Sequence, residues 1–114
     1  MSKLAIVAGA LTTVAIAGLA PALAHQTGFD SMHEQRREGN RVCMIDHWHY
    51  GSGSAQPNRK AAERSAVENW ASFTAFEYGT TWANFALAAS KKFNCEESGT
   101  GVRCDVEARP CKKR

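Results

Sequence analysis

The sequence lacks a strong charge of either sign and lacks a redox-type cysteine pair. Its 14 Lys and Arg residues against 11 Asp and Glu give a formal net charge of only +3 over 114 residues. That balance is too mild to indicate binding to nucleic acid. No Cys-x-x-Cys occurs among the four cysteines, which excludes a thioredoxin-type redox motif and a zinc knuckle.

Catalytic signatures are also missing. His33-Glu34 has no second histidine at the metalloprotease spacing, and neither a Gly-x-Ser-x-Gly elbow nor a Walker A loop is present. Glu77 lies at the border of an apolar stripe, but one carboxylate does not make an acid–base pair. The sequence therefore predicts a protein that is not an enzyme and that uses no cofactor.

The longest apolar run is too short for a membrane anchor. Leu4 to Leu19 is almost wholly apolar, follows Lys3, and leads to the small-residue segment Ala22-Leu23-Ala24. This is the pattern of an export signal with an Ala-x-Ala cleavage site, and no stop-transfer cluster follows it. We expect residues 1–24 to be a signal peptide. Cleavage would release a secreted or periplasmic chain of about 90 residues without a membrane span.

The cysteines all follow the expected cleavage site. An even number behind an export signal indicates disulfides in an oxidising compartment. A chain of about 90 residues buries only about 60–65% of its extended surface, so it gains much from covalent links. We expect two disulfides among Cys43, Cys95, Cys104 and Cys111.

Four cysteines allow three pairings, and spacing alone does not decide among them. Cys95 and Cys104 fall on the same face of two runs that flank one turn, so a hairpin could set them opposite each other. Cys43 and Cys111 would then join the two ends of the domain. Pairing of Cys95 with Cys111 is the main alternative, because a direct cross-strand bond needs a specific separation of the Cβ atoms.

A helix is predicted over residues 58–78. Pro57 suits its entrance, Asn58 or Ser54 could cap it, and Gly79 suits its end. Apolar residues recur at helical spacing in between. The stripe expected to face the core is formed by Ala62, Ala66, Trp70, Phe73 and Phe76.

A C-terminal hairpin is predicted after this helix. Residues 102–109 alternate between apolar and charged side chains, Phe93 and Cys95 alternate with polar neighbours, and turn residues lie at 97–101. Residues 81–89 fit either a helix or a strand. A short strand is favoured there, because one helix needs a sheet wide enough to cover it.

The expected fold class is therefore α+β, with one long amphipathic helix packed on a small antiparallel sheet with a C-terminal hairpin, stapled by two disulfides. Residues 25–41 are polar without a sustained apolar period, which predicts a flexible leader. The folded domain is expected over residues 42–111, followed by a basic tail at 112–114.

A looser pattern runs through most of this domain. Its parts are, in order, Asp46-His47-x-His49-Tyr50-Gly51-x-Gly53, then Ala62, Ala66 and Trp70, then Tyr78-Gly79 with Trp82-Ala83, and finally Cys95, Cys104 and Ala108-Arg109-Pro110-Cys111. The pattern resembles that of small exported bacterial proteins of uncharacterised function. The resemblance implies no activity, ligand or catalytic residue.

Two histidines form the sharpest candidate site. His47 and His49 are two residues apart, so in an extended segment both imidazoles point to one side. Asp30 or Asp46 could add a carboxylate, and a chain that begins at His25 could bind copper through its free amine and imidazole. The competing interpretation is that the two histidines only cover the helix start or bond to the glycine loop.

A second candidate is an anion site before the helix. Gly51 and Gly53 precede Arg59 and Lys60, which could present backbone amides and cations to a phosphate, a sulfate or an acidic glycan. An ordinary turn explains the same residues.

Two functions follow from these observations. The first is a small exported, non-catalytic module of the envelope or the medium that binds a protein, a glycan or another cell-surface component. The alternative is a periplasmic protein that binds copper or zinc through His47 and His49.

Overall fold

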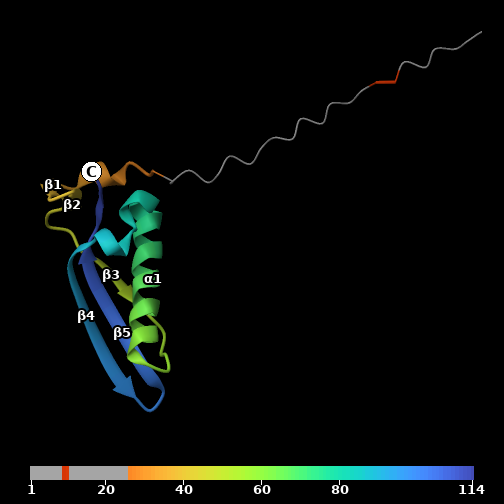
Figure 1. Ribbon diagram of the computed structural model, residues 1–114, viewed down its shortest axis with the longest axis vertical. Coiled ribbons are helices and arrows are strands. Elements are labelled where there is room, and N and C mark those ends of the chain that lie inside the picture. Colours follow the sequence, from red (N-terminus) through yellow and green to blue (C-terminus); the bar gives the residue numbers. More distant parts are fainter. Residues whose placement is uncertain (1–8, 11–25) are drawn as a thin grey trace, which may run out of the picture.

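Two three-stranded antiparallel sheets and one long helix make up the fold (Figure 1). The computed structural model describes residues 9–10 and 26–114, so most of the predicted signal peptide, its cleavage site and His25 lie outside the described residues. Within that described part, none of the helices has the length and apolar character needed to span a bilayer. The elements follow one another as η1 (Phe29–Met32), β1 (Gln35–Glu38), β2 (Arg41–Met44), β3 (His49–Ser52), α1 (Arg59–Tyr78), η2 (Thr80–Trp82), η3 (Phe85–Leu87), β4 (Ala89–Ser98), β5 (Gly101–Arg109) and β6 (Cys111–Lys113).

Helix α1 begins and ends where the sequence predicts. Asn58 caps its start, because the side-chain oxygen accepts a hydrogen bond from the amide of Ala61. Gly79 follows its last residue with a φ of 98°, a backbone conformation that glycine adopts more easily than other residues. The predicted helix is confirmed.

The core lies between α1 and the sheet of order β3-β5-β4 (Figure 1). The helix contributes Ala62, Ala66 and Trp70 to this core. Farther along the helix Thr74 and Tyr78 are also buried, and Tyr78 packs in a separate cluster with Met44 and Trp82. Strand β5 contributes Val102, Cys104, Val106 and Ala108, as its alternation predicts. The indole nitrogen of Trp70 donates to the carbonyl of Ala108 at 3.3 Å. The α+β class, with one long helix on a small antiparallel sheet, a hairpin of β4 and β5 and two disulfides, is confirmed.

The prediction of the apolar stripe of α1 is wrong for two of its five residues. Phe73 and Phe76 are 47% and 83% exposed, although their spacing predicts them in the core. Thr74 and Tyr78 take the buried face in the last turns of α1. The reason is that the imidazole of His49 fills the space opposite this part of the helix and hydrogen-bonds to Thr74. A polar contact therefore decides which face is buried.

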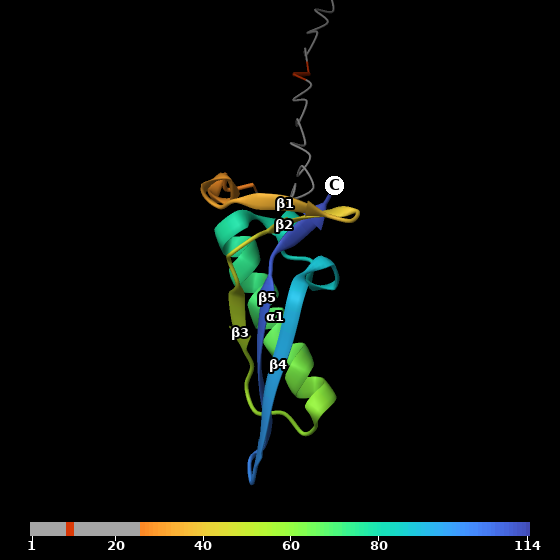
Figure 2. The ribbon, with the colours of Figure 1, turned by 90° about the vertical axis from the view of Figure 1, so that its left-hand side faces the viewer.

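The predicted flexible leader is also wrong over residues 26–41. This segment contains η1 and β1, and β1 pairs with β2 in a second sheet of order β1-β2-β6. Figure 2 shows β1 and β2 lying across one end of the helix and the long sheet. The side chains of β1 are polar, but its backbone amides and carbonyls form hydrogen bonds with those of β2. Two residues of the predicted basic tail, Lys112 and Lys113, belong to β6 and pair with Val42 and Arg41.

Residues 81–89 do not form the expected short strand. Two 3-10 turns, η2 and η3, occupy most of this segment, and β4 begins only at Ala89. Asn84 stabilises η3, because its side-chain oxygen accepts a hydrogen bond from the amide of Ala86. The sheet reaches its width through β3 instead.

The disulfides follow the favoured pairing. Cys95 and Cys104 lie directly opposite each other on β4 and β5. Cys43 and Cys111 join β2 to β6. The alternative bond between Cys95 and Cys111 is excluded by this arrangement.

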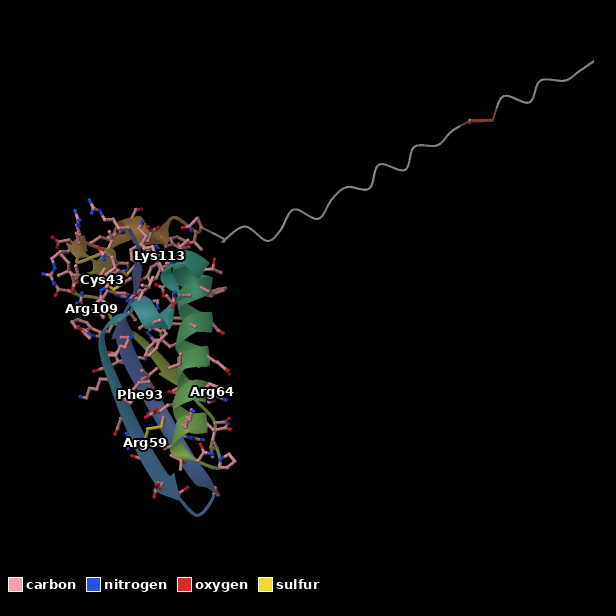
Figure 3. All side chains as sticks on the ribbon, viewed as in Figure 1. Cys43, Arg59, Arg64, Phe93, Arg109 and Lys113 are labelled. Atoms are coloured by element: carbon pink, nitrogen blue, oxygen red, sulfur yellow. A yellow bond between two sulfur atoms is a disulfide. The ribbon has the colours of Figure 1, made fainter. Side chains whose placement is uncertain are left out.

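Arg109 connects the two sheets. Its guanidinium makes two hydrogen bonds to the carboxylate of Glu38, at 2.7 and 2.8 Å, and further bonds to the Met44 carbonyl and the Ser90 hydroxyl. The Glu38 interaction raises the pKa of Arg109, and the Arg109 hydrogen bonds hold the pKa of Glu38 below its usual range. Figure 3 shows Arg109 and Cys43 close together where the sheets meet.

Candidate metal centre

Histidine side chains from two separate segments converge at the C-terminal end of α1. His33 precedes β1 and His47 follows β2, so the two residues lie just beyond the open end of the β1–β2 hairpin. The amide of Ile45 donates to the carbonyl of Glu34 at 3.0 Å and extends the hairpin toward them. The two imidazoles stack with ring centroids 4.0 Å apart.

The helix end holds the N-terminal segment in place. The hydroxyl of Thr27 donates to the carbonyl of Glu77 at 2.6 Å, and Gln26 pairs with Gly79 in an isolated bridge. These contacts dock the segment that leads to His33 against the last turn of α1.

The hydroxyl of Tyr78 lies between the two stacked imidazoles. It is 2.7 Å from Nε2 of His33 and 2.7 Å from Nε2 of His47. A phenol has one proton, so it donates to one of these nitrogens and accepts from the other. Burial, together with the carboxylate of Glu77, raises the pKa of Tyr78, and the phenol therefore remains protonated at neutral pH.

His49 is 2% exposed and has an unpaired ring nitrogen. The hydroxyl of Thr74 donates its proton to the carbonyl of Trp70 at 2.7 Å, so it accepts from Nδ1 of His49 at 2.9 Å. This bond fixes the neutral ring with its proton on Nδ1. Nε2 then carries a lone pair, and it lies 3.2 Å from Oε2 of Glu77 without forming a hydrogen bond.

The imidazoles of His47 and His49 are neutral at neutral pH. Burial lowers the pKa of His49 to about 4, although the nearby Glu77 carboxylate opposes this shift. Burial also lowers the pKa of His47, with a smaller contribution from His33, again against Glu77. Neutral imidazole is the form that binds a metal ion.

Three of these side chains are close enough to share one ion. Ligand atoms of His33, His47 and Glu77 all lie within 4.8 Å of one another. The predicted pair of His47 and His49 is brought together, with ring centroids 5.0 Å apart. Asp30 and Asp46 are not members of this group in the described residues, and His25 lies outside them.

His33 is a member of the candidate cluster that the sequence pattern does not single out, because in the sequence it stands only beside Glu34 in an incomplete metalloprotease motif. The signal that could have found it is Gly39-Asn40, a dipeptide typical of two-residue hairpin turns. A hairpin folded at that turn places His33 and His47 at its open end.

The predicted anion site is not assembled. An added Cβ at Gly51 would lie 2.6 Å from the backbone nitrogen of Trp70, so Gly51 serves the close approach of β3 to α1. The amide of Gly53 is hydrogen-bonded to the carbonyl of Cys104. Arg59 pairs with Glu63, and Lys60 is exposed to solvent. Figure 3 shows Arg59 far from the histidine end of the helix, which lies toward Lys113.

Several large apolar side chains remain on the surface. Phe73 packs beside His49, with ring centroids 4.8 Å apart, so exposed aromatic surface borders the histidine cluster. The exposed set consists of Phe29, Met32, Trp48, Tyr50, Phe73 and Phe76.

Comparison of the chain with protein-family models, with curated proteins and with solved structures finds no match. No ligand, activity or partner is therefore carried over from another protein. The residues gathered at the end of α1 are the basis on which a function can be assigned.

Proposed function

We propose that this chain is a small exported, non-catalytic protein that binds a divalent transition-metal ion, zinc or copper, through His33, His47 and Glu77. His49 is not within reach of all three of these ligand atoms, but its Nε2 lies 3.2 Å from Oε2 of Glu77 and would become a fourth donor if the site closes around an ion. The proposal keeps the histidine pair that the sequence singled out and adds two ligands from other elements.

One observation carries the proposal. Nε2 of His49 is buried without a hydrogen-bond partner, and it faces a carboxylate oxygen of Glu77 at 3.2 Å. Two electron-pair donors at this distance repel each other unless a cation or a proton lies between them. The side chain is fixed in this orientation by Thr74, so it cannot turn its Nδ1 proton toward the carboxylate.

The ligand atoms of the cluster need to move only slightly closer together to bind an ion. Tetrahedral zinc, at about 2.0–2.1 Å from nitrogen or oxygen, brings its ligand atoms to about 3.3 Å from one another. The donor atoms of His33, His47 and Glu77 lie within 4.8 Å, so side-chain rotations of modest size complete the site. The hydroxyl of Tyr78 lies between the two imidazoles in the metal-free protein. It would move out of the way of the ion, or donate a hydrogen bond to an exogenous ligand of the ion.

The donor atoms also limit the choice of metal. Imidazole nitrogen with one carboxylate oxygen is a set that zinc and copper(II) favour, whereas magnesium and calcium prefer oxygen alone. The two disulfides are of the kind that persists in oxidising compartments. This supports a secreted or periplasmic location, in agreement with the export signal that the sequence predicts.

Calorimetric titration of the metal-free protein with zinc(II) and copper(II) tests the proposal. We expect one ion per chain with a Kd below about 1 µM. His33→Ala, His47→Ala and Glu77→Gln should each weaken binding by at least about tenfold. His49→Asn, which preserves a donor for Thr74 but removes Nε2, should weaken it as well.

Glu63→Gln is the matched control, because Glu63 is a carboxylate on the same helix that pairs with Arg59 away from the cluster. Circular dichroism of each variant verifies that it is folded. Failure of both metals to bind stoichiometrically below about 100 µM would refute the proposal, and so would tight binding that survives in His33→Ala/His47→Ala.

A second function, recognition of a protein, a glycan or another cell-surface component, is favoured by the exposed aromatic surface. Phe73 and Phe76 lie on α1 next to the histidine cluster and are at least 47% exposed. Co-sedimentation with isolated envelopes tests it. Phe73→Ser/Phe76→Ser should reduce the bound fraction, whereas Ser72→Ala on the same helix should leave it unchanged.

A further inference from the structure

Strand β4 leaves one side of the longer sheet open. It is ten residues long and pairs only with β5, since the sheet order is β3-β5-β4. Figure 2 shows β4 at the front of the molecule, with no other strand along its outer side. Among the described residues, this is the longest sheet edge without a partner strand. An edge of this kind can pair with another strand.

The outward-facing backbone groups can be identified. Cys95 and Cys104 are directly opposite each other with Cα atoms 4.1 Å apart, the short spacing of a pair that exchanges no backbone hydrogen bonds. The amide and carbonyl of Cys95 therefore point away from β5. Because this alternates along a strand, the same groups of Phe93 and Glu97 point outward too.

The charges along this strand are divided by sign. Residues 90–98 read Ser-Lys-Lys-Phe-Asn-Cys-Glu-Glu-Ser, with both lysines before Asn94 and both glutamates after it. None of these four charges takes part in an ion pair within the described chain. The sequence is therefore complementary in charge to its own reverse.

We propose that β4 is a dimer interface whose occupant is a second copy of this chain, paired antiparallel about Asn94. In this register Lys92 lies opposite Glu96 of the partner subunit. Lys91 belongs to the irregular stretch of β4 between Ala89 and Lys92 and comes near Glu97 of the partner subunit. Each pair occurs twice because the axis is two-fold. Opposite charges in directly opposed positions stabilise a pair of strands.

The backbone pattern fits the same register. Phe93 lies opposite Cys95 of the partner subunit, and both residues have outward-facing amides and carbonyls, so they form hydrogen-bonded pairs. Asn94 lies opposite its own copy in a pair that exchanges no bonds. The result is a six-stranded antiparallel sheet with both α1 helices on one face.

Other registers lose this complementarity. A shift by two residues places Lys92 opposite Asn94 or Ser98 of the partner subunit and removes its ion pair. Parallel pairing in register places lysine against lysine and glutamate against glutamate, which destabilises the pair. Charged residues on an edge normally prevent association, but here their separation by sign favours one arrangement.

Charge reversal in solution tests this interface. Sedimentation equilibrium of the full exported protein should show a dimer whose dissociation constant rises with salt. Lys92→Glu should weaken the dimer by at least about tenfold, since it faces Glu96 of the partner subunit. Lys92→Glu/Glu96→Lys exchanges the two signs and should restore it. Lys60→Glu, on the exposed surface of α1, is the matched control and should change nothing.

A monomer at every concentration up to about 1 mM would overturn the proposal. A dimer that Lys92→Glu leaves intact would overturn it as well. The register has its own test in Asn94→Cys: the two Cα atoms across the axis would be about 4.5 Å apart, within reach of a disulfide. We expect a covalent dimer on oxidation, whereas Ser72→Cys on the helix should give none. A dimer that Asn94→Cys fails to cross-link would exclude this register.

Discussion

Nε2 of His49 and Oε2 of Glu77 face each other across 3.2 Å without a hydrogen bond. Thr74 fixes the imidazole, and the docking of the N-terminal segment on the last turn of α1 fixes the backbone of Glu77. The protein therefore keeps a buried base beside a carboxylate and places His33 and His47 around them. A buried nitrogen without a hydrogen-bond partner costs folding free energy, and this unpaired nitrogen is the observation on which the proposed metal site rests.

In the presence of a chelator, the free energy of unfolding should decrease as the pH is lowered below 6.5. The pKa of His49 is about 4 in the folded protein and 6.5 when the chain unfolds, so between these values the unfolded chain binds more protons. The free energy of unfolding should therefore drop by roughly 3 kcal/mol from pH 6.5 to pH 4 and be level above 6.5. Urea titrations across this range measure it.

His49→Asn provides the control for this pH dependence. The asparagine does not titrate and can still donate to Thr74. The loss of free energy of unfolding between pH 6.5 and pH 4 should therefore be smaller in this variant, and should contain only the contributions of His47 and the carboxylates. An unchanged slope in His49→Asn would show that His49 is not buried in its neutral form.

Gly51→Ala should destabilise the fold by about 3 kcal/mol. The added methyl group would lie 2.6 Å from the backbone nitrogen of Trp70 and even closer to the carbonyl oxygen of Ala66. Gly99→Ala is the matched control, because nothing lies within 4 Å of its added Cβ, and its effect should stay within about 0.5 kcal/mol. Thermal denaturation of both variants compares them. Equal melting temperatures would mean that β3 does not pack this closely on α1.

Glu38→Ala should cost about 2 to 3 kcal/mol, since it leaves the buried guanidinium of Arg109 without its two carboxylate bonds. Chemical denaturation measures the loss. Arg36→Ala, at an exposed position 3.7 Å from the same carboxylate, should change stability by less than about 0.5 kcal/mol. If Glu38→Ala proves as stable as the parent, β1 is not docked in solution.

Loss of the Cys43–Cys111 bond should destabilise more than loss of the Cys95–Cys104 bond. The two bonds span 68 and 9 residues of sequence. In the chain-entropy treatment, bonds of these lengths contribute roughly 4 and roughly 2.5 kcal/mol. Urea unfolding of two variants, each with both cysteines of one bond replaced by alanine, measures which loss of stability is larger. The reverse order would indicate that strain or residual structure outweighs chain entropy here.

The helix and the β4–β5 hairpin could be predicted because their patterns are local. Side chains of α1 and β5 repeat with the period of their own element, and Cys95 and Cys104 flank a single turn. The favoured disulfide pairing followed from that hairpin. The resemblance to small exported proteins stays a prediction, because the comparisons give no match.

The end of the molecule around β1 could not be predicted in the same way. The side chains of Gln35–Glu38 show no alternation, and what holds them is backbone pairing and an ion pair to Arg109, 71 residues away. The exposure of Phe73 likewise depends on His49, 24 residues earlier in the chain, filling the buried side of α1. His33 is distant in sequence from Tyr78, and only the tertiary fold brings the two together.

The bond between Cys43 and Cys111 makes the end of the fold that carries the histidine cluster sensitive to the redox state of its surroundings. It anchors β2 to β6, β2 carries β1, and β1 is preceded by His33. In a reducing compartment β2 would lose its covalent link to β6, whereas the pairing of β1 with β2 would still keep His33 near His47. If the chain binds metal as proposed, reduction of this bond should loosen the attachment of the histidine cluster to the rest of the fold, so the oxidised chain should hold the ion more tightly than the reduced one.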